Sequence, residues 1–95
     1  MINTIITNNR KQILSISKKH GVSSLKIFGS MSRGDAGEKS DADFLVEMEA
    51  GYDLFDLGSC LVELQDLLNC KVDLVTRDAL HPRIRDKVLK EARPL

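Results

Sequence analysis

Two short polar segments in the middle of the chain have the residue types that phosphoryl-transfer chemistry uses. Gly29 and Ser30 end one apolar run, and after ten intervening residues Asp41 and Asp43 come at the start of a second. Glycine lets a ligand approach the backbone, and a turn that enters a helix presents N–H groups to phosphate. Positions i and i+2 of a strand project from the same face, so Asp41 and Asp43 would present two carboxylates together. This combination predicts a site for Mg²⁺ carrying a phosphorylated ligand.

A third carboxylate, Asp73, lies between Val72 and Leu74 in a short aliphatic run, where it would project from the face opposite its two neighbours. An acidic residue inside a strand needs a partner or a metal ion. We therefore predict that Asp41, Asp43 and Asp73 form the catalytic and metal-binding set. Two divalent ions about 4 Å apart can bind the attacking and leaving oxygens, and Asp73 could take the proton of an acceptor hydroxyl. Asp41 could instead cap the loop before the strand.

Three further residues are weaker candidates, each with a structural alternative. Arg33 could offset charge on a leaving pyrophosphate, because its planar fork suits phosphate, or it could fix the loop through a salt bridge. Tyr52 could stack on a base or pack against the following helix. His20 could act as a general base, but its place before Gly21 favours a role at a helix end.

Hydrophobic spacing predicts the elements that position these residues. Phe44, Leu45 and Val46 are consecutive apolar residues, which predicts a strand buried on both faces. Asp53 is suited to begin a helix, and Asn69 to end it. The predicted elements are helices over 3–19, 53–68 and 82–92, strands over 24–29, 42–48 and 71–76, and a turn over 30–35.

Composition limits the function classes. The chain has 95 residues, which we interpret as one domain over 1–95. It has zero formal net charge and only four aromatic residues, three phenylalanines and one tyrosine, which argues against direct nucleic-acid binding. Cys60 and Cys70 lack metal-ligand spacing. The sequence has no apolar run that predicts a membrane span and no signal-peptide pattern, so we expect a cytoplasmic protein.

The string GSMSRGDAGEKSDADFLV, residues 29–46, resembles the signature of the nucleotidyltransferase superfamily that includes DNA polymerase β. It is most similar to the minimal nucleotidyltransferases, which are the antitoxins of toxin–antitoxin pairs with a HEPN ribonuclease toxin. The resemblance extends from about residue 10 to the end of the chain. The family's motif matches this sequence position by position at Gly29, Ser30, Asp41, Asp43 and Asp73.

The resemblance implies an α/β fold with a small mixed sheet flanked by helices. It also implies Mg²⁺ as the metal, ATP as the donor, and transfer of AMP to a tyrosine of a cognate HEPN toxin, which is thereby neutralised. Two alternatives remain at this point. The chain could be a binding antitoxin that neutralises by occlusion through the helix over 53–68 or the basic last helix. It could also modify a small molecule, although it has no second domain to shape a pocket for one.

Overall fold

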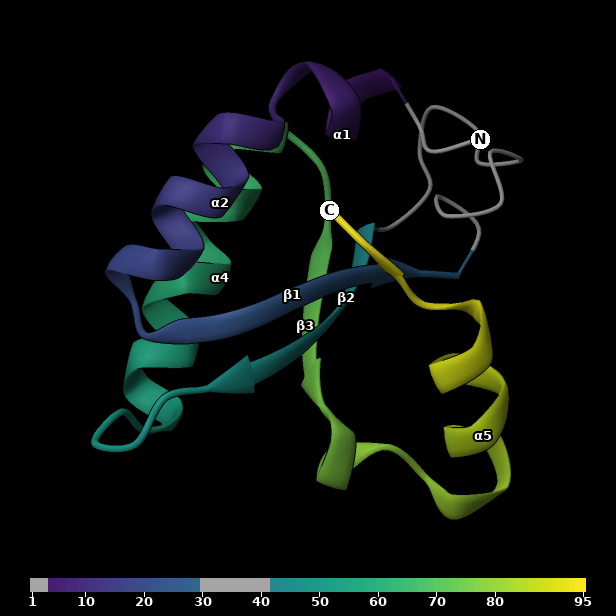
Figure 1. Ribbon diagram of the computed structural model, residues 1–95. Coiled ribbons are helices and arrows are strands. Elements are labelled where there is room, and N and C mark those ends of the chain that lie inside the picture. Colours follow the sequence, from purple (N-terminus) through teal and green to yellow (C-terminus); the bar gives the residue numbers. More distant parts are fainter. Residues whose placement is uncertain (1–3, 30–41) are drawn as a thin grey trace.

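The structure is a computed structural model that describes residues 4–29 and 42–95. Its centre is a four-stranded mixed sheet with strand order β3-β2-β1-β4 (Figure 1). β1 pairs antiparallel with both β2 and β4, whereas β2 and β3 are parallel. The strands are β1 (Val22–Phe28), β2 (Ala42–Met48), β3 (Val72–Thr76) and β4 (Arg93–Pro94).

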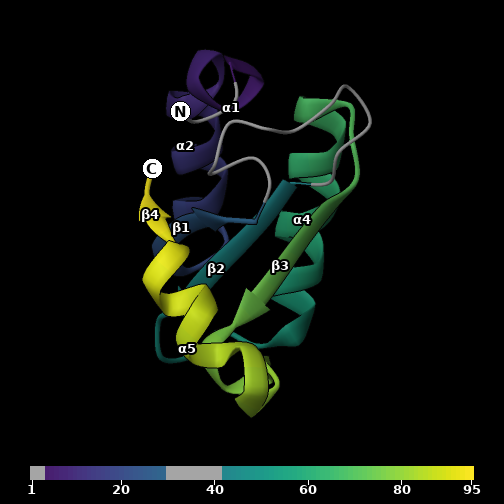
Figure 2. The ribbon, with the colours of Figure 1, turned by 90° about the vertical axis from the view of Figure 1, so that its right-hand side faces the viewer.

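Helices cover both faces of this sheet, which confirms the predicted α/β class. The helices are α1 (Thr4–Asn8), α2 (Arg10–Lys19), α4 (Leu54–Leu68), the short 3₁₀ helix η1 (Arg77–Ala79) and α5 (Pro82–Glu91). α2 and α4 lie together on one face, and α5 covers part of the other (Figures 1 and 2). Among the described residues, no helix is long and apolar enough to cross a membrane.

The hydrophobic core has two layers because side chains of a strand alternate between the faces of the sheet. Ile27 and Phe44 are fully buried on the side of α2 and α4. Leu45 is buried on the other side with Leu80 and Val88, beneath α5. β2 therefore contributes to both layers, as its apolar run predicted.

The predicted boundaries of α4 are confirmed within one residue. Asp53 is the N-cap, and its side chain accepts hydrogen bonds from the backbone N–H groups of Phe55 (2.9 Å) and Asp56 (3.2 Å). Asp56 accepts one in return from the backbone N–H of Asp53, which completes a capping box. Asn69 ends the helix in the left-handed conformation, with φ of 52°.

The prediction of one continuous helix over 3–19 is wrong. The helix is interrupted at Asn9, whose side-chain amide donates to the carbonyl oxygen of Ile5 at 2.8 Å. Asparagine competes with helical hydrogen bonding in this way, so it favours helix ends. Residue 3, where this helix was predicted to begin, and the predicted turn over 30–35 lie outside the described residues.

Two short elements were not predicted, and one strand is longer than expected. β1 begins at Val22 rather than at residue 24. η1 follows β3 directly, and β4 pairs Arg93 with Ile27 and Pro94 with Lys26. A two-residue strand has no periodicity of its own, because only its tertiary pairing defines it.

Candidate active site

Two of the three predicted catalytic carboxylates lie side by side at one end of the sheet. Asp43 pairs with Phe28 of β1 on one side and with Asp73 of β3 on the other. Paired residues of neighbouring strands, about 4.8 Å apart, project from the same face of a sheet. Leu45, two positions after Asp43, lies under α5, so both carboxylates belong to the face that carries α5. The sequence-based expectation that Asp73 lies opposite Val72 agrees with this arrangement.

Gly29 follows β1 directly and borders the carboxylate of Asp43. Its φ is +76°, a left-handed conformation that side-chain-bearing residues rarely adopt. A Cβ atom at this position would lie 2.7 Å from Oδ2 of Asp43, closer than real Cβ contacts. Glycine is therefore required both by the backbone conformation and by the proximity of the carboxylate. Because glycine has no side chain, the Asp43 carboxylate can lie against the backbone of Gly29.

The other predicted site residues, Ser30, Arg33 and Asp41, lie outside the described residues. Within residues 4–29 and 42–95, no group of three or more acidic, histidine or cysteine side chains could hold a metal ion. The placed pair nevertheless fits Mg²⁺, which typically uses one or two carboxylates and completes its shell with water and substrate phosphates. Gly29 has no side chain, which lets a ligand approach the backbone beside Asp43.

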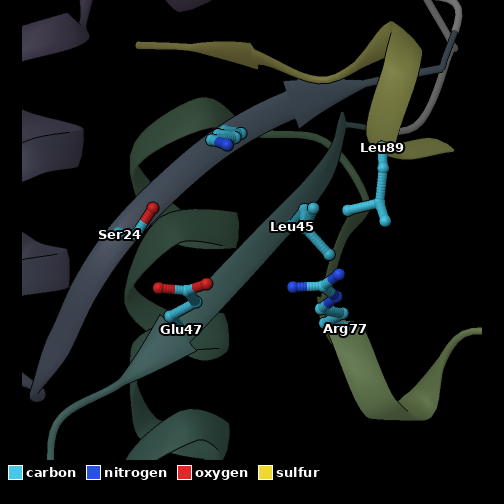
Figure 3. A pocket seen from close by; sticks show the side chains of 6 residues that line it. Ser24, Leu45, Glu47, Arg77 and Leu89 are labelled. Atoms are coloured by element: carbon cyan, nitrogen blue, oxygen red, sulfur yellow. The ribbon is translucent and has the colours of Figure 1, made fainter.

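A small hollow lies farther along the same face (Figure 3). Lys26 pairs with Leu45, so its side chain projects from the same face of the sheet as Asp43. Lys26 was not among the predicted site residues. The alternation of side chains along β1 nevertheless places it on the same face as Phe28, two positions later. The hollow measures about 70 Å³, far below the 300–1,000 Å³ typical of ligand pockets, so it does not fit a nucleotide. Its lining residues are Ser24, Lys26, Leu45, Glu47, Arg77 and Leu89.

Tyr52 is remote from the two carboxylates. A Cβ atom on Gly21 would overlap the ring of Tyr52, so the ring packs directly over that glycine. Gly21 precedes Val22, which pairs with Met48 at the end of the sheet opposite Asp43. This position supports a packing role, with Gly21 as a partner that was not predicted, and argues against stacking on the base of a nucleotide bound beside Asp43.

His20 also lies away from the carboxylates and ends α2, as the sequence favoured. Its backbone N–H donates to the carbonyl of Ile16 at 3.2 Å, and its Nε2 is 3.1 Å from Oε1 of Glu63 in α4. Lys19 contacts the same carboxylate at 2.8 Å. Hydrogen bonds from Lys19 and then His20 lower the pKa of Glu63, whereas burial raises the pKa of the Cys60 thiol. Cys60 and Glu63 both belong to α4, so neither pKa shift concerns the face of the sheet that carries Asp43 and Asp73.

Comparison with known proteins identifies the family. Residues 10–95 match the model of the nucleotidyltransferase domain. A relative from Methanocaldococcus jannaschii, named "Putative protein adenylyltransferase MJ0435", is 40% identical over 87 residues, which cover 92% of this chain and 94% of the relative.

Solved structures share the fold. A protein described as a "putative minimal nucleotidyltransferase" superposes with a TM-score of 0.87 at 40% identity, over 100% of this chain and 97% of that one. A more distant structure shows the fold alone, with a TM-score of 0.68 at 19% identity, over 93% of this chain and 69% of that one. It is a complex of a tri-AMPylated Shewanella oneidensis HEPN toxin with an MNT antitoxin. The chain therefore belongs to the nucleotidyltransferase domain family.

Proposed function

We propose that this protein is an antitoxin that transfers AMP from ATP to a tyrosine hydroxyl of a cognate HEPN ribonuclease toxin. The observation that carries the proposal is the in-register pair Asp43 and Asp73, with the side-chain-free Gly29 beside Asp43. The name of the Methanocaldococcus jannaschii relative, a protein adenylyltransferase, supports a protein acceptor. The AMPylated toxin in the Shewanella oneidensis complex indicates which class of protein that acceptor is.

The reaction joins the acceptor oxygen to the α-phosphorus of ATP and breaks the bond from that phosphorus to pyrophosphate. The tyrosine hydroxyl must lose its proton, and Asp73, at the edge of the carboxylate pair, is assigned to accept it or to position the hydroxyl. The turn at Gly29 and Ser30 is assigned to hold the β- and γ-phosphates. Arg33 is assigned to offset the charge that develops on the leaving pyrophosphate.

Asp41, Asp43 and Asp73 would hold Mg²⁺, two ions in the full site. Bound there, Mg²⁺ supplies positive charge that offsets the charge of the phosphates during transfer. The protein's own contribution is to fix the carboxylates before substrate binds. Adjacent strands fix the two carboxylates because backbone hydrogen bonding sets the register of Asp43 and Asp73. The carboxylates therefore need no reorganisation during the reaction.

The direct test is the intact mass of the protein encoded beside this one, the candidate HEPN toxin, purified after co-expression. With the wild-type chain we expect the toxin to gain one or more adenylyl units, and mutation of its acceptor tyrosine to phenylalanine to abolish the gain. The Asp41→Asn/Asp43→Asn double variant should leave the toxin mass unchanged. Asp66→Asn, which alters an exposed carboxylate on α4, is the matched control and should behave as wild type.

The same experiment separates catalysis from occlusion. If the double variant still neutralises the toxin while the toxin mass is unchanged, the protein acts by binding and the proposed chemistry is wrong. Transfer to a small hydroxyl compound in the absence of any protein acceptor would instead favour a small-molecule nucleotidyltransferase.

A further inference from the structure

The outer surface of α4 is uncharged and apolar over two turns, on the side that faces away from the sheet. Leu54, Phe55 and Val62 have exposed fractions of 80%, 86% and 56%. Phe55 and Val62 are seven residues apart, which places them on one line along the helix. Gly58 and Ser59 lie between them and are also exposed. We call these five residues the α4 stripe.

Gly58 has no close neighbour within the described part of the chain that would require a glycine. A Cβ atom built on it would meet nothing within 4 Å, and it lies in the interior of α4, where glycine is less favourable than alanine. Gly21 and Gly29, by contrast, each lie against a side chain of this chain. A helix glycine without an internal neighbour, flanked by exposed Phe55 and Val62, fits the close approach of another backbone from outside.

We infer that the α4 stripe is a twofold interface through which two copies of this chain associate. Apart from Leu54, the stripe is symmetric about the point between Gly58 and Ser59, with Phe55 and Val62 equally far from it. An antiparallel α4 pair centred there would bring small residues together at the crossing and place Phe55 of each copy on the other copy's Val62. Such self-complementarity is what an isologous contact requires.

Charge selects the antiparallel arrangement. α4 carries Asp56 near its start and Glu63 and Asp66 towards its end, and its described residues include no basic side chain. In a parallel pair, each of these carboxylates would lie beside the same carboxylate of the other chain, and like charges in contact are destabilising. An antiparallel pair separates the equivalent carboxylates along the helix axis. The antiparallel pair also opposes the two helix dipoles favourably.

The exposed area is sufficient for a small dimer. An aromatic side chain can bury about 150–250 Å², and complete burial of the five stripe residues in both copies would remove on the order of 1,000 Å², the lower limit for a specific interface. The position of the stripe argues against the toxin as its occupant. α4 lies on the face of the sheet opposite Asp43 and Asp73, so a protein docked there would not bring its hydroxyl to those carboxylates (Figure 2). A dimer through the stripe leaves both active sites open.

The test is the oligomeric state of the purified full-length chain, measured by light scattering at about 100 μM, with intact folding checked by circular dichroism. We expect a dimer for wild type and a monomer for Phe55→Asp and for Gly58→Gln. The control Ile84→Asp, at an apolar side chain of α5 that is 48% exposed, should remain dimeric. Wild type that is monomeric, or a dimer that survives both stripe variants, would overturn the inference.

Cysteine crosslinking tests the symmetry. In the antiparallel pair the two copies of residue 59 meet at the axis, whereas the copies of residue 66 lie roughly 20 Å apart. Ser59→Cys should therefore form an intermolecular disulfide under mild oxidation, and Asp66→Cys should not exceed the wild-type background from Cys60 and Cys70. Crosslinking of both variants would indicate a parallel pair, and crosslinking of neither would contradict the interface. Toxin binding lost in Phe55→Asp, with a monomeric wild type, would assign the stripe to the toxin instead.

Discussion

Gly29 and Asp43 are so close that a single methyl group cannot be placed between them: a Cβ on Gly29 would lie 2.7 Å from Oδ2 of Asp43. Gly29 directly follows β1 and Asp43 lies in β2, and the chain between them includes the predicted site residues Ser30, Arg33 and Asp41. The backbone conformation of Gly29 and the orientation of the Asp43 carboxylate are therefore linked. A substitution of Gly29 therefore tests the importance of this contact without changing any of the carboxylates.

Gly29→Ala should abolish most AMP transfer and cost more activity than stability. The substitution adds left-handed backbone strain of about 1–2 kcal/mol and also displaces the Asp43 carboxylate. The control is Gly51→Ala, since Gly51 has φ of +94° but open space around its Cβ position. We expect Gly51→Ala to lower the thermal midpoint to a similar extent while transfer is retained. Equal transfer by both variants would show that the close contact between Gly29 and Asp43 is not needed for catalysis.

Asp73→Asn should lower the transfer rate by about 10²-fold or more, the scale for removing a group that stabilises charge in a transition state. The fold should persist, because Asp73 is only partly buried and asparagine has nearly the same shape. Rates of toxin modification under single-turnover conditions measure the effect. Asp78→Asn, an exposed residue of η1, is the control. Wild-type rates for Asp73→Asn would remove Asp73 from the catalytic set.

Tyr52→Ala should destabilise the protein by about 1–2 kcal/mol without weakening ATP binding, because the ring packs on Gly21 at the end of the sheet away from Asp43. Urea unfolding and nucleotide titration measure the two effects separately. Tyr52→Phe keeps the ring and should leave both quantities unchanged. A selective loss of nucleotide affinity in Tyr52→Ala would restore the base-stacking interpretation.

The cluster that joins α2 to α4 should make stability sensitive to acid. Lys19 and His20 lower the pKa of Glu63 from its ordinary value of 4.5, so its ionised form is favoured in the folded state. This contribution is fully present above that value and is lost as the pH falls through the lowered pKa of the folded state. Thermal midpoints of wild type and Glu63→Gln should differ at pH 7 and converge as the pH falls below the lowered pKa of Glu63. Glu49→Gln, at an exposed position, should show no such convergence.

The sequence by itself determined the strongly periodic elements and the chemistry. The apolar run Phe44–Val46 predicted a strand buried on both faces, and Asp53 with Asn69 defined α4, because capping and periodicity are local signals. The motif residues Gly29 and Asp43, with Asp73, were found by residue type and spacing. The order of the strands was not available from these signals.

Tertiary structure decided what depends on pairing between distant segments. Only the parallel register of β2 and β3 places Asp43 beside Asp73, thirty positions later in the chain. The position of Tyr52, away from Asp43 and Asp73, is known only from its packing over Gly21. Likewise, Arg93–Pro94 is a strand only because it pairs with β1. Local propensity specifies helices and strands, but register and face are fixed by long-range hydrogen bonding and burial, which a linear pattern does not contain.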